Sequence, residues 1–224
     1  MALERIVFSR LAPGARVLDL CCGSGDLCQA LIPRGYQVTG LDGSEEMLRY
    51  ARAKAPSAEF LHRDARDFEL RSVFDAVLST FDSLNHVLTL PELERVFVNA
   101  RRALVPGGFL CFDLNMETCF RTIWRGASSS IEPDRVWMVR GSYDPDQKMG
   151  RVELTMFRPE KGADQPPRCW RRLDVTIAER CYAPEEIQGG LERAGFRALE
   201  THDAYDLGMR GDTGTGRSFF VGFK

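Results

Sequence analysis

Short apolar runs that alternate with helical patterns fill the first half of the chain. The runs predict buried parallel strands at residues 17–20, 36–41, 58–61, 74–79 and 109–114. Helical patterns lie between them, at residues 26–34 before Gly35, after a cap at Ser44 and before Pro56, and from Pro91 onward. Strands that alternate with helices predict a parallel sheet with helices on both faces, joined by right-handed crossovers.

The pattern changes after Asn115. Alternation of apolar and polar residues with a period of two predicts an antiparallel addition of three strands, at residues 135–142, 149–157 and 171–181. A helix from Pro184 to Gly195 and strands at residues 196–200 and 218–223 complete the chain. We therefore predict an α/β fold with a doubly wound, mostly parallel sheet and an antiparallel β insertion.

The composition excludes several classes of protein. The chain has 224 residues, 44% of them apolar and 28% charged, which suits one soluble domain with a sizeable insertion. Its net charge of −2 argues against nucleic acid and membrane partners, since both select clustered positive charge. Residues 1–12 contain charges where a signal peptide needs an uninterrupted apolar stretch, so we expect a cytoplasmic protein.

The cysteines predict free thiols and no metal site. There are seven of them, an odd number, and no pair has C-x-x-C spacing. Cys21 and Cys22 are adjacent, so their side chains would point in opposite directions at a strand end and could not easily share one ion.

The stretch VLDLCCGSGD, residues 17–26, places a glycine turn after the first predicted strand. A dinucleotide-binding turn has the pattern G-x-G-x-x-G, in which the third glycine lets the helix pack closely on the strand. Gly23 and Gly25 occupy the first two positions, but Cys28 occupies the third. The broken fingerprint disfavours a nicotinamide-dependent oxidoreductase and leaves it as an alternative.

Acidic residues lie at the ends of three successive predicted strands: Asp19, Asp42 and Asp64. Because ligands of an open parallel sheet bind beyond the carboxyl ends of its strands, these carboxylates could line one crevice. An acid about 20 residues beyond the glycine turn is placed to bind both hydroxyls of a ribose. An acid beside the turn disfavours pyrophosphate, so the pattern indicates an adenosyl ligand without phosphates.

Five segments occur in a fixed order along the chain: VLDLCCGSGDL, GLDGSEEML, HRDARDF, FDAVLSTFDSLNHV and RALVPGGFLCFDLN. In this order they resemble the motifs of the class I S-adenosylmethionine-dependent methyltransferases that act on small molecules. The resemblance implies a Rossmann-like sheet of seven strands, the last antiparallel, and one bound S-adenosyl-L-methionine. Residues 1–116 would form the donor-binding half, residues 117–182 a β insertion or acceptor lid, and residues 183–224 the completion of the sheet.

The resemblance assigns twelve residues to the methyl donor: Asp19, Cys21, Gly23, Gly25, Asp42, Gly43, Met47, Asp64, Ala65, Arg66, Thr80 and Phe81. The two turn glycines would let the backbone approach the ligand, and Asp19 would steer their loop and the ligand's ammonium group. Asp42 would hold the ribose and Met47 would lie against the adenine. Asp64 and the Ala65 N–H would meet the adenine edge, and carbonyls near Thr80 the ammonium group. Taken singly, Met47 also fits a core position and Asp64 a turn cap.

The residues after the fourth predicted strand carry the candidate chemistry. Methyl transfer requires alignment of nucleophile, methyl carbon and sulfur, so a base is optional. His86 is the best candidate base, because histidine titrates near neutral pH, and Asp82 and Asn85 lie close in sequence. The alternative is a solvated, idle histidine at a helix start.

The acceptor is expected to be a small molecule with an amine nitrogen rather than a hydroxyl. Methyltransferases of nucleobase amines carry an Asn- or Asp-Pro-Pro-aromatic run after the fourth strand, and this chain does not. Small-amine N-methyltransferases carry residues comparable to those found here. Candidate acceptor-binding residues are Asn85, Tyr143, Arg180 and Tyr182.

Several alternatives stay open. The aromatic and arginine residues of the insertion (Trp137, Arg151 and Trp170 among them) fit an acceptor pocket, and they also fit a homodimer interface. A non-catalytic ligand-binding scaffold would keep the same sheet. About fifteen residues precede the first predicted strand, fewer than in many class I methyltransferases. Either the site is more open, or the insertion closes it, or a covering segment is missing from this sequence.

Overall fold

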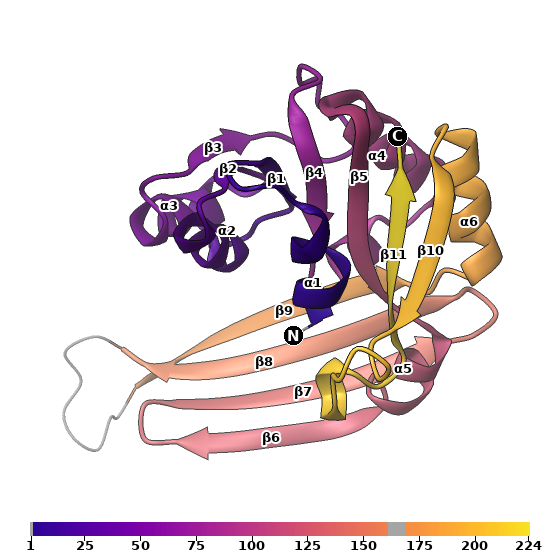
Figure 1. Cartoon of the computed structure of the whole chain (residues 1–224). Helices are drawn as coiled ribbons and strands as arrows, with labels where there is room; N and C mark the ends of the chain where they lie inside the picture. Colours follow the sequence, from indigo (N-terminus) through magenta and orange to yellow (C-terminus); the bar gives the residue numbers. More distant parts are fainter. Residues whose placement is uncertain (1, 161–168) are drawn as a thin grey trace.

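The computed structural model describes residues 2–160 and 169–224 and contains two β-sheets (Figure 1). The larger sheet has the strand order β10-β11-β5-β4-β1-β2-β3, and the smaller has the order β6-β7-β8-β9. The strands are β1 (Arg16–Leu20), β2 (Gln37–Asp42), β3 (Glu59–His62), β4 (Phe74–Ser79), β5 (Leu104–Asn115), β6 (Gly126–Glu132), β7 (Arg135–Asp144), β8 (Met149–Pro159), β9 (Trp170–Arg180), β10 (Arg197–Asp203) and β11 (Arg217–Phe223). The helices are α1 (Ala2–Ile6), α2 (Asp26–Leu31), α3 (Glu45–Lys54), α4 (Leu90–Ala103), α5 (Glu117–Thr122) and α6 (Pro184–Arg193), with short 3-10 turns that include η3 (Ser83–His86).

The larger sheet is doubly wound, as predicted. Strands β1 to β5 run parallel, and β11 lies antiparallel between β5 and β10. The strand order reverses between β1 and β4, which pair directly. In open sheets of this kind ligands bind at the reversal, beyond the carboxyl ends of the strands.

Helices cover both faces of this sheet and supply its core. On one face α4 and α6 pack against the strands, and the ring of Phe97 lies 5.3 Å from that of Phe112 in β5. On the other face the buried side chains of Leu31 in α2 and Leu48 in α3 join Val17 of β1. The inner strands β1, β2, β4, β5 and β11 are therefore buried on both faces, whereas the edge strands β3 and β10 are partly exposed.

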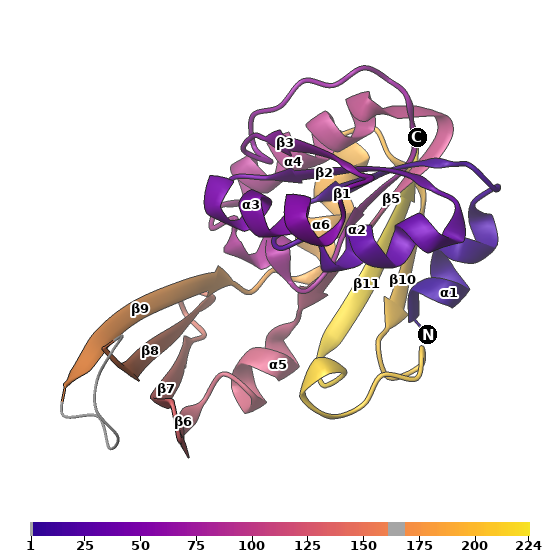
Figure 2. The same cartoon turned by 90° about the vertical axis from the view of Figure 1, so that its left-hand side faces the viewer.

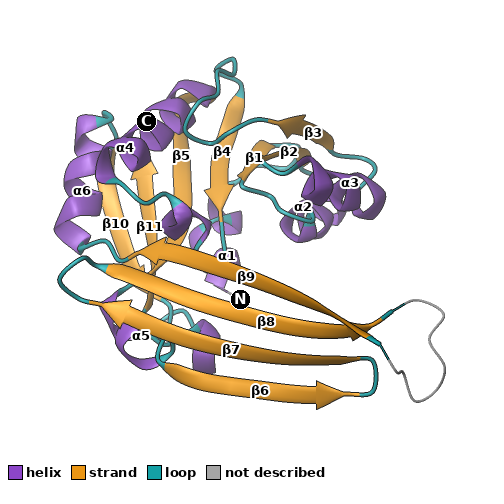
Figure 3. Cartoon of the chain, turned by 180° about the vertical axis from the view of Figure 1, so that it is seen from behind, coloured by secondary structure: helices purple, strands orange, loops and turns teal. Residues whose placement is uncertain are grey.

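The insertion forms the second sheet, which projects from the end of the molecule where β4 and β5 terminate (Figures 2 and 3). The prediction of three strands here was wrong, because β6 adds a fourth that pairs antiparallel with β7. Its sequence GASSSIE carries no alternation of apolar and polar residues, and most of its residues are exposed at the sheet edge. An exposed edge strand needs no apolar face, so the period-two signal was missing.

The cysteine side chains lie mainly in the core. All seven cysteines are free, and most of them are buried. Within residues 2–160 and 169–224 no cluster of three or more His, Cys, Asp or Glu is arranged to hold a metal ion. No helix in the same ranges has the length and apolarity to cross a membrane.

Candidate functional site

The loop between β1 and α2 is held in left-handed backbone conformations. Cys21, Gly23 and Gly25 have φ angles of 62°, 52° and 80°. At Gly25 an added Cβ would lie 2.9 Å from the Cβ of Ala51 in α3, so only glycine lets α2 start this close to α3. Cys21 adopts this conformation without being glycine, and such strained residues cluster at functional sites.

Asp42 fastens this loop to the start of α3. Its Oδ2 accepts a hydrogen bond from the Gly23 N–H and its Oδ1 accepts one from the Ser44 N–H, each at 2.8 Å. Met47 is 39% exposed and lies beside Gly23, where an added Cβ would be 3.5 Å from its Cε. Met47 is therefore not a core residue, and the carboxylate, the glycine loop and the methionine lie together at the end of β2.

Asp19 lies in β1, just before the loop, and is hydrogen-bonded to Cys28 of α2 just after it. The side chain is buried, and its Oδ2 accepts a hydrogen bond of 3.2 Å from the Cys28 thiol. Burial raises the pKa of Asp19 to about 7. Cys28, which breaks the dinucleotide fingerprint, is therefore the hydrogen-bond partner of this buried acid of β1.

Asp64 follows β3 and is tied to Arg66. Its Oδ1 accepts from the Arg66 backbone N–H at 2.8 Å, and its Oδ2 pairs with the guanidinium at 2.6 Å. These hydrogen bonds hold the pKa of Asp64 below its usual range. Ala65 is buried between them, and His62 Nε2 lies 3.0 Å from the Gly43 carbonyl oxygen. The turn-cap contacts expected as the alternative are therefore present, on a side chain that is nearly half exposed.

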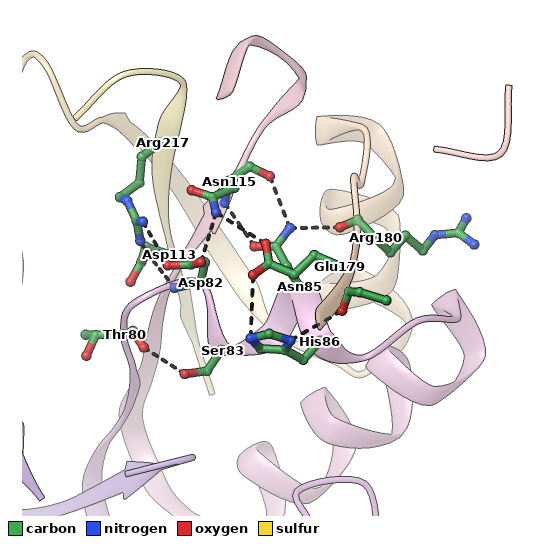
Figure 4. Close-up of polar contacts among 11 residues, drawn as sticks. Thr80, Asp82, Ser83, Asn85, His86, Asp113, Asn115, Glu179, Arg180 and Arg217 are labelled. Carbon is green, nitrogen blue, oxygen red and sulfur yellow. Dashed lines mark hydrogen bonds and ion pairs between the residues drawn. The ribbon is translucent and has the colours of Figure 1, made fainter. Parts of the chain in front are cut away.

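A second polar group gathers where β4 and β5 end (Figure 4). Phe81 and Asp82 have φ angles of 60° and 51°, and their N–H groups donate to the Asp113 carboxylate at 2.8 and 3.0 Å. Arg217 of β11 pairs with Asp113 and, at 2.8 Å, with Asp82. Burial raises the pKa of Asp113, and the charge of Arg217 opposes that rise. Thr80 precedes this turn, and its carbonyl oxygen accepts from the Ser83 hydroxyl at 2.8 Å.

Glu179 of the insertion completes this group. Asn115 Nδ2 donates to Asp82 Oδ2 at 2.9 Å and to Glu179 Oε2 at 3.3 Å. Burial first, and then the charge of Asp82, raise the pKa of Glu179 to about 9. We call Asp82, Asp113, Asn115, Glu179 and Arg217 the carboxylate cluster.

His86 lies against the insertion. Its Nε2 is 3.5 Å from Glu179 Oε1, and its Nδ1 is 3.4 Å from the Ala178 carbonyl oxygen. Half of the side chain is exposed. Both ring nitrogens therefore face β9, while one edge of the ring faces solvent.

Sequence comparison connects this geometry to a family. Residues 17–108 match a family model described as a methyltransferase domain. The chain is 30% identical over 214 residues to a protein of Geobacillus sp. (strain WCH70) that bears a methyltransferase name, an alignment covering 93% of this chain and 84% of that protein. This chain belongs to the class I S-adenosylmethionine-dependent methyltransferases. Its methyl donor is therefore S-adenosylmethionine.

Two further similarities bear on the methyltransferase. A solved S-adenosylmethionine-dependent methyltransferase of Clostridium acetobutylicum ATCC 824 matches the fold with a TM-score of 0.82 at 21% identity, over 99% of this chain and 88% of that one. A Streptomyces venezuelae dTDP-3-amino-3,4,6-trideoxy-alpha-D-glucopyranose N,N-dimethyltransferase is 35% identical over 103 residues. That alignment covers 46% of this chain and 44% of the Streptomyces enzyme.

The glycine loop of the methyltransferase fits an adenosyl ligand. At Gly23 the nearest atom to an added Cβ is the flexible end of Met47, so the backbone is open to close approach on that side. Asp42 places a carboxylate next to this opening. The missing third glycine is no obstacle to the packing of α2 on β1, because Cys28 at that position is fully buried in the same core as Val17 and its thiol donates to Asp19.

The predicted acceptor-binding residues are divided between the core, with Asn85 and Tyr182, and positions nearer the surface, with Tyr143 and Arg180. Asn85 is fully buried, and its Nδ2 donates to the backbone oxygens of Asn115 at 3.1 Å and Arg180 at 2.8 Å. Tyr182 is buried, with its hydroxyl donating to the Val87 carbonyl oxygen. Both side chains use their polar atoms to fix the insertion to the end of the sheet.

Arg180 and Tyr143 lie nearer the surface. The Arg180 guanidinium pairs with Glu186 at 3.2 Å and lies over the ring of Tyr182. Tyr143 stacks on Phe120 of α5 with ring centroids 5.3 Å apart. Neither side chain contacts the carboxylate cluster through a hydrogen bond or ion pair in the described part of the chain.

The cluster contains residues that the sequence analysis missed: Asp113, Asn115, Glu179 and Arg217. Asp113 and Asn115 had a signal, because FDLN places polar side chains at the end of an apolar run. Glu179 and Arg217 had none, because Glu179 lies in an alternating strand and Arg217 is a single charge before an apolar run. Only the packing of β9 on η3 and of β11 on β5 brings them to the site.

Proposed function

We propose that this methyltransferase transfers a methyl group to the amine nitrogen of a small molecule. The observation that carries the proposal is the charge of the carboxylate cluster, which holds three carboxyl groups but one guanidinium, that of Arg217, paired with Asp82 and Asp113. Buried acids with too few cations favour a positively charged ligand, because a nearby cation stabilises their ionised form. A protonated amine supplies that charge, and a neutral hydroxyl does not.

A cavity beside the cluster supports a small acceptor. It has a volume of about 490 Å³, within the range of small-molecule pockets. Thr80, Phe81, Asp113 and Arg217 line it on the side of the cluster. The rest of the lining is mainly apolar and also includes the charged residues Glu4, Asp26 and Arg34. The partial similarity to an amino-sugar N,N-dimethyltransferase agrees with an acceptor of this size and charge.

On the donor side, we propose that the twelve residues assigned by sequence bind S-adenosylmethionine. Asp42 would hold the ribose hydroxyls, and Met47 and Asp64 would flank the adenine. The bound donor supplies an electrophilic methyl carbon on a sulfonium. The acceptor nitrogen's lone pair forms the new N–C bond, while the electron pair of the C–S bond leaves with sulfur.

We propose that His86 accepts the proton that the acceptor amine must lose. An amine that is protonated at neutral pH has no free lone pair and must lose a proton before it can attack. His86 lies at the boundary between the carboxylate cluster and solvent, so it can receive that proton and release it to water. Alignment of the acceptor nitrogen with the methyl carbon and the sulfur supplies the rest of the rate acceleration.

The insertion, residues 117–182, is proposed as the acceptor lid, because its strand β9 brings Glu179 into the cluster. Tyr143 and Arg180 are then the insertion's outer acceptor contacts. A homodimer formed through the insertion is the competing arrangement, and sedimentation velocity over a range of protein concentrations separates the two.

Matched acceptors test the proposal. Purified protein and S-adenosylmethionine are incubated with amino sugars, small amines and their hydroxyl counterparts, and products are followed by mass and by release of S-adenosylhomocysteine. We expect a gain of one or two methyl groups on amines and none on the matched alcohols. Methylation of the alcohols alone would overturn the amine proposal. Binding of a nicotinamide cofactor in place of S-adenosylhomocysteine would overturn the donor assignment.

A further inference from the structure

Glu179 is a buried acid with no assigned part in the reaction. It lies on β9 opposite Gly150, its side chain is 3% exposed, and it reaches across to the end of the larger sheet. Groups from several elements face it: Asp82 and His86 at η3, Asn115 of β5, Cys119 of α5 and Arg217 of β11. Among these charged and titratable groups, His86 alone has a half-exposed side chain.

In the part of the chain that the structure describes, the polar contacts of the His86 ring are made with the strand that carries Glu179. The Ala178 carbonyl oxygen faces Nδ1 and the Glu179 carboxyl faces Nε2, so two neighbouring residues of β9 hold both ring nitrogens. A carbonyl can only accept, which places a proton on Nδ1 and leaves the lone pair of neutral His86 on Nε2. The atom that would act as base is therefore the one beside Glu179.

We propose that Glu179 is a positioning residue for His86 in methyl transfer: it orients the imidazole and exchanges a proton with Nε2. This inference rests on the proposed amine methylation, in which His86 receives the acceptor's proton. When the protonated acceptor binds, its charge stabilises the ionised form of Glu179, so the proton on Oε1 passes to Nε2 and leaves to water from the exposed imidazolium ring. The Glu179 carboxylate then holds the neutral imidazole, whose Nε2 lone pair takes the acceptor's proton and releases it to water in turn. After methyl transfer Glu179 regains a proton from water through Nε2. No other reactant is needed.

The charge balance of the cluster explains how Glu179 holds this proton. Burial and the neighbouring Asp82 carboxylate both favour the neutral form of Glu179, and they place its pKa at about 9. Arg217 opposes them, but its guanidinium is already paired with Asp82 and Asp113. Glu179 therefore carries its proton at neutral pH and loses it only in alkaline solution or when a cation approaches.

Nuclear magnetic resonance of the histidine rings tests this inference without an acceptor. The chain has only three histidines, so a His86→Ala variant assigns the His86 signals. In the wild type we expect the His86 shifts to show a second, alkaline step near pH 9 as Glu179 ionises. Glu179→Gln, which mimics the neutral carboxyl, should fold and lose that step. Asp174→Asn, on the same strand but paired with Arg172 and Thr155, should keep it.

A second variant keeps the test decisive if Glu179→Gln does not fold. Asp82→Asn removes the negative charge beside Glu179, so the alkaline step should move to lower pH. An alkaline step that stays in place in Glu179→Gln, or does not move in Asp82→Asn, would overturn the inference.

Turnover separates positioning from a purely structural role. With an amine acceptor, Glu179→Gln should lower kcat by about tenfold, less than the ~100-fold or more expected for loss of the base itself. Its pH–rate profile should change shape while KM for S-adenosylmethionine stays constant. A profile of unchanged shape would mean that Glu179 only fills space. If amines are not methylated at all, the proposed function fails, whereas the histidine titration still reports on the Glu179–His86 pair.

Discussion

Replacing Asp42 tests the donor site most directly. The carboxylate accepts two backbone hydrogen bonds of 2.8 Å, from Gly23 and Ser44, and thereby joins the glycine loop to the start of α3. Asp42→Ala removes both acceptors at once. It also removes the proposed partner of the ribose hydroxyls, so the loop and the ligand lose the same anchor.

The expected loss can be estimated from these contacts. A hydrogen bond to a charged group contributes roughly 1.5–3 kcal/mol. Loss of the ribose contact alone should therefore weaken binding of S-adenosylhomocysteine by about 2 kcal/mol, which is about 30-fold in Kd. Release of the Gly23 loop adds to this. The fold should persist, because β2 and α3 keep their packing in the core.

Titration calorimetry with S-adenosylhomocysteine measures the change, and circular dichroism confirms the fold. Asp75→Ala is the matched control, since the Asp75 Oδ2 accepts a backbone N–H from Arg16 at 2.8 Å, at the amino ends of β1 and β4. We expect Asp75→Ala to cost stability and to leave Kd unchanged. An unaltered Kd in folded Asp42→Ala would show that the ribose does not bind at the end of β2.

Three further predictions follow from the site. His86→Ala should lower turnover of an amine acceptor roughly 10²-fold or more in steady-state assays and leave KM for S-adenosylmethionine unchanged. A rate within a few-fold of wild type would mean that His86 lines the site without acting as a base. Burial raises the pKa of Asp19 from 3.8 to about 7, so the folded state holds this proton and wild-type stability falls as pH rises toward 7. Asp19→Asn has no carboxyl to ionise, so its free energy of unfolding in urea, relative to wild type, should rise by about 2–3 kcal/mol from pH 5 to pH 8. The same pH dependence of stability in both proteins would contradict the raised pKa. Gly25→Ala should destabilise the protein by about 2 kcal/mol or more in the same assay, because its φ is 80° and its Cβ would meet Ala51; an unchanged midpoint would mean that the loop can move.

The sequence by itself determined the order along the chain of the strands in the larger sheet and predicted that the glycine turn, Asp19 and Asp42 lie together. Apolar runs closed by glycines and acids are local signals, and parallel strands must bring their carboxyl ends to one edge of the sheet. Asp19, Asp42 and the glycine turn could therefore be placed together before any contact was known. Capping at Ser44, whose hydroxyl accepts from the Met47 N–H, was also local and was confirmed.

Only the tertiary structure decided what surrounds β4. The strand β6 escaped prediction because an exposed edge needs no apolar alternation. The carboxylate cluster joins residues 135 positions apart in the chain, such as Asp82 and Arg217, and no local pattern specifies which strand end a distant acid or arginine will meet. The orientation of His86 likewise depends on strand β9 folding back against η3, which brings Glu179 to its Nε2. Burial then fixes the protonation of Asp19 and Glu179, because the energetic cost of a buried charge exists only after the core has closed around it.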